Sequence, residues 1–179
     1  AYGCNAPVLA LTGQIPSAAV GQGFGQLHEI PNQLGLIANI TKSAARIEHA
    51  TQAPQKVREA FQALRSGVPG PAELEMAMDL LGQASEVDLL EAVDPTPNPT
   101  PDEDAINQAA ALLGKAQRPM IVVGGGAVHA SAEVQRIAEL LEAPVVSGRL
   151  GRGIISDRHY LSQTQPMGHK LWADSDAVL

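Results

Sequence analysis

A short apolar segment that runs directly into three glycines limits most strongly what this chain can fold into. Met120–Val123 is rich in β-branched side chains and leads into Gly124–Gly126, a pattern typical of a buried strand that ends in a tight turn. Ser131–Leu141 then has apolar residues at helical spacing. Residues 143–148 (APVVSG) predict a second parallel strand. We therefore expect a βαβ unit, and such units bind nucleotides at the carboxyl ends of their strands.

The three glycines do not identify a nucleotide site by themselves. The dinucleotide-binding pattern G-x-G-x-x-G needs a glycine at the position held by His129, and the P-loop pattern is absent from the sequence. This mismatch disfavours an NAD-dependent oxidoreductase. A purely structural strand-to-helix turn is an equally good interpretation of the segment.

The composition favours an α/β fold and argues against several classes of partner. Hydrophobic residues make up 45% of the 179 residues but aromatic residues only 3%, so aliphatic side chains must fill the core, as in sheets covered by helices on both faces. The net charge of −7 and the scattered basic residues argue against nucleic acid. A single cysteine, Cys4, excludes a disulfide framework and favours the cytoplasm. We expect no membrane partner, because no apolar run reaches spanning length.

The first half of the chain predicts another parallel-sheet unit. Pro7–Gly13 predicts a buried strand, Leu36–Thr41 a weaker strand, and Pro54–Arg65 a helix. Ala72–Leu81 fits a strand and a helix equally well, because its apolar residues match both periods. The predicted helix carries one apolar face, made of Val57, Phe61 and Leu64.

A proline-rich segment separates the two halves. Asp94–Pro101 has proline at every second position, which predicts an extended linker. Thr100 and Glu103 predict a capping box at the start of the next helix. We therefore expect a first domain over residues 1–85, a linker over residues 86–101 and a second domain over residues 102–179.

Several segments, in the same order, resemble the thiamine-diphosphate-dependent enzymes of the acetolactate synthase type. In the first half these are PVLALTGQIP (Pro7–Pro16), NITK (Asn39–Lys42) and VREAFQALRSGVPGP (Val57–Pro71). In the second half they are AQRPMIVVGGGA (Ala116–Ala127), APVVSGRLGRG (Ala143–Gly153) and DSDAVL (Asp174–Leu179). Their order and spacing agree with the family over nearly the whole chain, which is far more specific than any single motif.

The resemblance implies that residues 1–85 are the C-terminal part of a pyrimidine-binding domain and residues 102–179 a truncated, Rossmann-like central domain. It also favours a strand for Ala72–Met78. The family's reaction needs a glutamate early in the pyrimidine domain and a later domain that binds diphosphate and metal, and we find neither in this sequence. We therefore expect a fragment that is inactive alone, without catalytic residues or metal ligands.

The parent enzyme implied by the resemblance uses thiamine diphosphate and Mg²⁺ to decarboxylate a 2-oxo acid and to ligate the product to an acceptor. Members of this family are homodimers or homotetramers, so we expect a cytoplasmic homo-oligomer. A non-catalytic nucleotide-binding or scaffolding α/β domain is the alternative.

The resemblance implies a first group of site residues near a substrate channel. Lys42 occupies the position of a lysine that would attract the carboxylate of a 2-oxo acid. His28 and Glu29 align with a Phe-Gln pair of the relatives, although Phe24 and Gln26 are alternative candidates for that pair. The change to His-Glu favours a related decarboxylase or carboligase over strict acetolactate synthesis, and ordinary loop contacts are the competing interpretation.

A second group of implied site residues faces a nucleotide-type cleft of the central domain. Glycine permits close backbone approach, and an arginine suits phosphate. The cleft holds FAD in some relatives, ADP in others and nothing in the rest, and Thr164–Gly168 lacks one glycine and a histidine of the flavin-binding pattern. The predicted cofactor-binding residues are Gly124, Gly125, Gly126, Gly148, Arg149 and Gly151.

Overall fold

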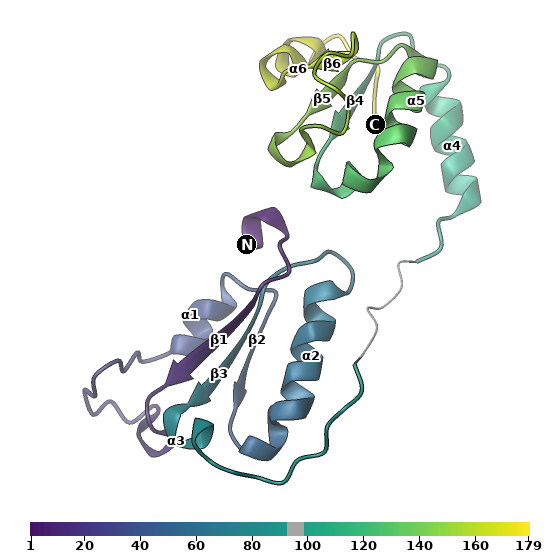
Figure 1. Cartoon of the computed structure of the whole chain (residues 1–179). Helices are drawn as coiled ribbons and strands as arrows, with labels where there is room; N and C mark the ends of the chain where they lie inside the picture. Colours follow the sequence, from purple (N-terminus) through teal and green to yellow (C-terminus); the bar gives the residue numbers. More distant parts are fainter. Residues whose placement is uncertain (93–98) are drawn as a thin grey trace. The chain divides into compact units, whose positions relative to one another are not determined.

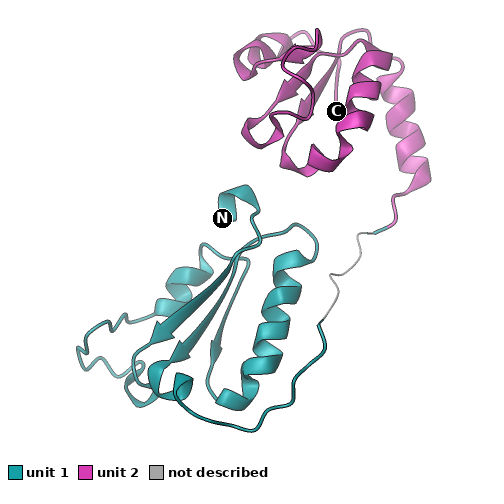
Figure 2. Ribbon diagram, in the orientation of Figure 1, with its two compact units in different colours: residues 1–99 teal, residues 100–179 magenta. Residues whose placement is uncertain are grey.

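The computed structural model describes residues 1–92 and 99–179, and these form two compact units. Unit 1 comprises Ala1–Pro99 and unit 2 comprises Thr100–Leu179 (Figure 1, Figure 2). Each unit is a parallel sheet with helices packed on it, which confirms the predicted α/β fold class. Residues 93–98 of the predicted linker lie outside the described residues.

Unit 1 is built on a three-stranded parallel sheet in the order β1-β3-β2. The strands are β1 (Leu9–Gln14), β2 (Ser43–Ile47) and β3 (Ala72–Ala77). The helices are α1 (Gln33–Ala38), α2 (Ala53–Arg65) and α3 (Met78–Leu81). Single 3₁₀ turns lie at η1 (Tyr2–Cys4), η2 (Ser17–Ala19) and η3 (Ala50–Gln52).

The central strand β3 has two very different faces. Ala72 and Leu74 pack against Ala60 and Leu64 of α2 in the main core of unit 1. Because side chains alternate along a strand, the two glutamates of β3 point to the opposite face, on which α1 lies (Figure 1). The sequence AELE (Ala72–Glu75) thus places aliphatic side chains on one side of the sheet and carboxylates on the other.

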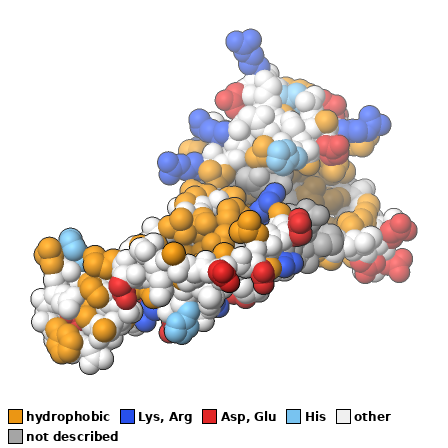
Figure 3. All heavy atoms as spheres, turned by 60° about the horizontal axis from the view of Figure 1, so that its bottom comes forward, with side chains coloured by type: hydrophobic (Ala, Val, Ile, Leu, Met, Phe, Trp, Pro, Cys, Tyr) orange, Lys and Arg blue, Asp and Glu red, His pale blue; other side chains and the backbone are white. Residues whose placement is uncertain are grey.

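The predicted helix Pro54–Arg65 is confirmed, but its buried face differs from the prediction. Ala60 and Leu64 are buried, whereas Val57 and Phe61 are 37% and 47% exposed. Val57 and Phe61 instead line a surface groove together with Leu89 and Leu90. Figure 3 shows how hydrophobic side chains gather on the exposed surface in that view.

Two local predictions for unit 1 have different outcomes. The strand predicted at Leu36–Thr41 is wrong, because α1 forms there and the strand follows it as β2. Asn32 caps α1: its side-chain oxygen accepts a hydrogen bond from the Gly35 amide at 2.9 Å. The strand at Ala72–Met78 is confirmed as β3, because parallel pairing with β1 and β2 decides what the local pattern left open.

Unit 2 contains a four-stranded parallel sheet in the order β6-β5-β4-β7. The strands are β4 (Pro119–Val123), β5 (Val145–Ser147), β6 (Ser162–Gln163) and β7 (Ala177–Val178). The helices are α4 (Glu103–Leu113), α5 (Ser131–Leu141) and α6 (Gln165–Trp172). The 3₁₀ segments are η4 (Gly125–Ala130) and η5 (Arg149–Gly151). The predicted strand–glycine turn–helix–strand order is confirmed as β4-η4-α5-β5.

The start of α4 differs from the predicted capping box. Asp102, rather than Thr100, is the N-cap, and its carboxylate accepts from the amide of Asp104 at 2.9 Å. A carboxylate placed directly before the helix satisfies its free amides and interacts favourably with the helix dipole. The proline at position 101 therefore precedes the helix instead of opening it.

The carboxyl ends of β4 and β5 are held together by close backbone packing. The Gly148 amide donates to the carbonyl of Val123 at 2.8 Å. A Cβ atom on Gly151 would lie 2.3 Å from that same carbonyl oxygen, which is far inside van der Waals contact. Gly151 is therefore required for η5 to lie against the end of β4.

We expect Gly151→Ala to lower the free energy of unfolding by about 1–3 kcal/mol, because the added methyl group forces η5 away from β4. Gly126→Ala is the matched control, since a Cβ there meets no atom within 4 Å. Denaturant unfolding of both variants measures the difference. Equal stability of the two variants would contradict the packing described here.

Candidate functional site

Unit 1 has a largely apolar cavity of about 620 Å³ at the carboxyl end of β1. Two residues predicted from the resemblance, Gln26 and His28, lie on its wall, whereas Phe24 and Glu29 do not. Phe24 is 69% exposed. The complete lining is Gly13, Gln14, Ile15, Pro16, Gln26, Leu27, His28, Gln33 and Met78.

The loop that carries His28 is organised by Glu29. The Glu29 carboxylate accepts hydrogen bonds from the backbone amides of Gly23 at 3.0 Å and Gln26 at 2.9 Å. His28 has a φ of 71°, a left-handed conformation that non-glycine residues seldom adopt. Within the described residues, Glu29 thus contacts the loop backbone and not the imidazole. A role of the two side chains in proton transfer stays a prediction.

Lys42 lies at the other end of the sheet. Its backbone amide donates to the carbonyl of Pro71 at 2.7 Å, directly before β3 begins. Its ammonium donates to the carbonyls of Ser66 and Val68, the latter at 2.8 Å. Because the three strands are parallel, Lys42 is at their amino ends and His28 at their carboxyl ends. The structure therefore does not bring Lys42 together with the cavity, and its predicted role at a substrate channel stays a prediction.

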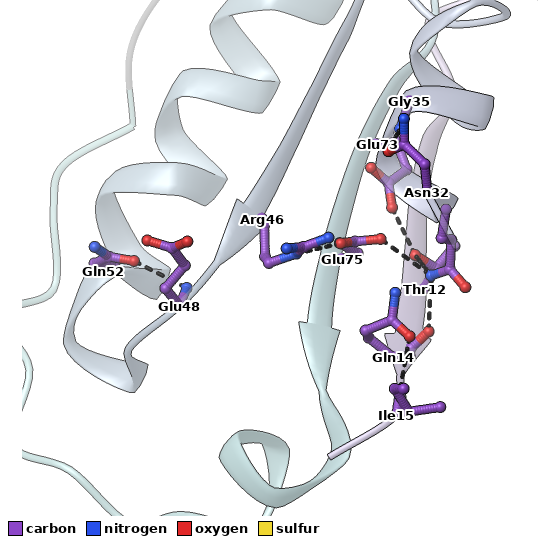
Figure 4. A network of polar contacts seen from close by, with 12 residues as sticks. Thr12, Gln14, Ile15, Asn32, Gly35, Arg46, Glu48, Gln52, Glu73 and Glu75 are labelled. Atoms are coloured by element: carbon purple, nitrogen blue, oxygen red, sulfur yellow. Dashed lines mark hydrogen bonds and ion pairs between the residues drawn. The ribbon is translucent and has the colours of Figure 1, made fainter. Parts of the chain in front are cut away.

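A buried polar network lies beside the cavity and was not predicted as a site (Figure 4). Glu73 and Glu75 of β3 are 1% and 0% exposed. Thr12 donates to Glu73 at 2.5 Å, and the guanidinium of Arg46 forms an ion pair with Glu75. Gln33 Nε2 also donates to Glu75, at 3.1 Å. The available sequence signal was the pair of acidic residues at alternate positions of a buried strand.

Glu73 is the less well satisfied of the two carboxylates. In the described part of the chain its Oε2 is the one buried side-chain polar atom without a hydrogen-bond partner. Burial raises the pKa of Glu73, and the charge of Glu75 raises it further, while the Thr12 hydrogen bond and the Arg46 charge act in the opposite direction. Glu75 has two strong partners, so the cost of burial falls mainly on Glu73.

Unit 2 has a more polar cavity of about 670 Å³ at the carboxyl ends of β5 and β6. Two arginines, Arg149 and Arg152, lie on its wall, and so does Asp157. The first turn of α6 also lines the cavity and has no side-chain cap on its amides. Cationic side chains and helix N-terminal amides are the groups that bind phosphate oxygens. The other lining residues are Ser147, Ser162, Gln163, Thr164, Gln165 and Pro166.

Of the predicted cofactor-binding residues, only Arg149 lies on this cavity wall. Three of the predicted glycines, Gly125, Gly148 and Gly151, lie where η4, η5 and the end of β4 pack closely. A Cβ on Gly125 would lie 3.3 Å from the Leu150 Cβ, and Gly148 and Gly151 contact the Val123 carbonyl. Arg152, in the same APVVSGRLGRG segment, was missed, although a second arginine so close to the first was a usable signal. The cofactor-binding assignment of the glycines stays a prediction.

The described residues contain neither a cluster of metal-binding side chains nor a membrane-spanning helix. Among residues 1–92 and 99–179, no group of three or more His, Cys, Asp and Glu side chains is placed to hold a metal ion. Within the same ranges, no helix has the length and apolar character needed to cross a bilayer.

Comparison with known proteins shows which family the chain resembles. Residues 106–179 match the model of the thiamine pyrophosphate enzyme central domain. The chain is 33% identical over 172 residues to a probable acetolactate synthase large subunit of Methanocaldococcus jannaschii, an alignment that covers 90% of this chain and 28% of that protein. Residues 106–179 thus belong to the thiamine pyrophosphate enzyme central-domain family, and over most of its length the chain is similar to enzymes of that kind.

Two other thiamine pyrophosphate enzymes match the chain over similar lengths. A probable 2-ketoarginine decarboxylase (AruI) of Pseudomonas aeruginosa is 30% identical over 184 residues, which cover 100% of this chain and 33% of that protein. A glyoxylate carboligase of Escherichia coli O157:H7 is 33% identical over 161 residues, which cover 87% of this chain and 26% of that protein. The chain thus spans a third or less of these relatives. The resemblance to the family is confirmed, and the non-catalytic alternative is not favoured.

Because Glu73 has a raised pKa, folding favours its protonated form. Its contribution to stability is greatest at low pH and is lost as the pH rises through the folded-state pKa. We expect Glu73→Gln to remove this loss, so that the stability of the variant relative to the unmodified chain increases as the pH rises above the ordinary pKa range of a glutamate.

Glu75→Gln is the contrasting control for this prediction. It removes the ion pair with Arg46, so we expect it to destabilise the chain at pH 8. Urea unfolding at a series of pH values measures both variants. A pH profile unchanged by Glu73→Gln would contradict the assignment.

Proposed function

We propose that this chain is part of a thiamine-diphosphate-dependent enzyme that decarboxylates a 2-oxo acid and transfers the resulting acyl-carbanion equivalent to an acceptor. The main support for this proposal is the similarity of the chain to three relatives, named as a synthase, a decarboxylase and a carboligase. The alignments with them cover 87–100% of this chain. Thiamine diphosphate, when bound, supplies the stabilisation of the carbanion, and Mg²⁺ is the ion that we propose to hold its diphosphate.

The described residues support a binding role for unit 1 rather than a complete reaction site. No Asp or Glu is among the residues that line its cavity, and none of the described residues forms a metal cluster. They do not fit the diphosphate and its metal ion, so we assign no reaction step to them. What unit 1 offers is an apolar cavity with polar groups at fixed positions, which suits binding and orienting a small organic acid.

The unit 2 cavity supports binding of the diphosphate of FAD or ADP. Arg149 and Arg152 supply two cations, and the first turn of α6, which has no side-chain cap, lines the same cavity through Gln165 and Pro166. Gly168 allows α6 to lie this close, because a Cβ there would be 2.6 Å from the Val146 Cγ1 atom. We assign the phosphates to this cavity, beside the β5 loop, and not to the three-glycine turn. Assembly into a homodimer or homotetramer and a cytoplasmic location stay predictions.

The enzyme proposal predicts release of carbon dioxide from a 2-oxo acid. We expect the complete product of the gene that carries this sequence to release ¹⁴CO₂ from carboxyl-labelled pyruvate or another short 2-oxo acid, and to lose this activity without thiamine diphosphate. The 179-residue chain alone, mixed with thiamine diphosphate, Mg²⁺ and pyruvate, should show no turnover. Turnover by the chain alone, or cofactor-independent activity of the complete product, would refute the proposal.

The nucleotide proposal predicts that the chain binds FAD or ADP through Arg149. We expect Arg149→Ala to weaken binding about tenfold, because it removes a charge-assisted hydrogen bond to phosphate. Arg158→Ala is the matched control, since Arg158 is exposed and does not line the cavity. Flavin fluorescence quenching and calorimetry with ADP give the affinities. Equal effects of the two variants would exclude this cavity as the phosphate site.

A further inference from the structure

The geometry points to the unit 1 cavity as a site for an uncharged group that both accepts and donates hydrogen bonds, and we propose that this group is a primary carboxamide. The inference rests on the proposed function and deepens it by naming a substrate class. The substrate would be a 2-oxo acid whose far end is a carboxamide rather than a carboxylate.

Gln14 supplies a hydrogen-bond donor of fixed orientation. Its side chain is only 6% exposed, and its Oε1 accepts from the backbone amide of Ile15 at 2.8 Å. This contact decides which end of the amide is oxygen, and Figure 4 shows the nitrogen turned away from Ile15. Within the described residues no group accepts from Nε2. Gln14 therefore presents a donor while lining the cavity.

Gln33 supplies the complementary acceptor. Its Nε2 donates to the Gly13 carbonyl at 3.0 Å and to the Glu75 carboxylate at 3.1 Å. Both partners are acceptors, so the nitrogen of the Gln33 amide must lie on their side. No donor from the described part of the chain reaches its Oε1. Because Gln33 also lines the cavity, this oxygen is left to accept from a ligand.

The two unused amide atoms are not closed off from a ligand. Glu73 Oε2 is the one fully buried, unpartnered side-chain polar atom in the described ranges, so Gln14 Nε2 and Gln33 Oε1 both retain access. Gln33 bonds to the carbonyl of Gly13, the residue before Gln14, and both glutamines line the same cavity. One donor and one acceptor on the same cavity wall are the complement of a –CO–NH₂ group.

Charge around the cavity disfavours an anion at this position. No Lys or Arg is among its lining residues. The nearest carboxylate behind the wall, Glu75, contacts Gln33 directly, and its one cationic partner is Arg46. A ligand carboxylate would also place two acceptor oxygens against the Gln33 acceptor, which is repulsive. The apolar part of the wall includes Ile15, which is buried, and Leu27 and Met78, which are exposed, while Gln26 and His28 are its other polar residues.

Three small probes of equal size test this site on the chain itself: pentanamide, pentanoate and 2-hexanone. They present a donor and an acceptor, a charged acceptor, and a neutral acceptor, respectively. We expect pentanamide to shift the side-chain amide NMR signals of Gln14 and Gln33 saturably, with an affinity about tenfold above that of either other probe.

Substitutions separate the Gln14 donor from general charge effects. Gln14→Glu keeps the shape but replaces the donor, so we expect it to abolish the preference for pentanamide. Gln22→Glu adds the same charge at an exposed position that does not line the cavity and should change the affinity by less than about twofold. If Gln14→Glu does not fold, Gln14→Met removes the donor without adding a charge.

Similar affinities for the three probes, tighter binding of pentanoate, or unshifted glutamine signals up to the solubility limit would each overturn the proposal. The measurement needs no thiamine diphosphate, so it is independent of the proposed enzyme activity. Amide binding without decarboxylation by the complete gene product would refute the enzyme proposal alone. Decarboxylation without amide selectivity would refute this inference alone.

Discussion

Parallel pairing around one central strand in each unit determines where every candidate site lies. β3 is in register with β1 on one side and β2 on the other, and β4 holds β5 and β7 in the same way. Because the strands run in one direction, all their carboxyl ends lie at one edge of the sheet. Both candidate cavities lie at these edges. Lys42, which precedes β2, is excluded from that edge by the same pairing.

The polar face of β3 in unit 1 is energetically costly because it buries two glutamates, Glu73 and Glu75. A carboxylate loses much of its hydration when buried and is stable there only with hydrogen bonds or an ion pair. Glu75 has Arg46 and Gln33, whereas one oxygen of Glu73 has no partner among the described residues. The same network fixes the Gln33 amide beside the cavity. The network that carries this energetic cost of burial therefore also orients the side chain of Gln33 at the cavity wall.

Features that depend on local sequence patterns were easier to predict than features that depend on contacts between distant segments of the chain. The strand–glycine–helix order of β4, η4 and α5 was predictable because local patterns determine it. The strand at Leu36–Thr41 failed because a short apolar run fits a helix as well, and the Asn32 cap decided the outcome. The roles of Gln14 and Gln33 were beyond local reasoning, since hydrogen bonds between distant segments set which atom each amide presents.

The two cavities differ in a way that assigns them to different ligands. The cavity of unit 2 has two arginines and uncapped helix amides on its wall, so a polyanion gains charge-assisted hydrogen bonds there. The cavity of unit 1 has no arginine or lysine on its wall, and its amides are fixed in opposite polarity. An anion would lose hydration there without a compensating cation. We therefore propose that unit 2 selects its ligand by charge and that unit 1 selects its ligand by hydrogen-bond polarity.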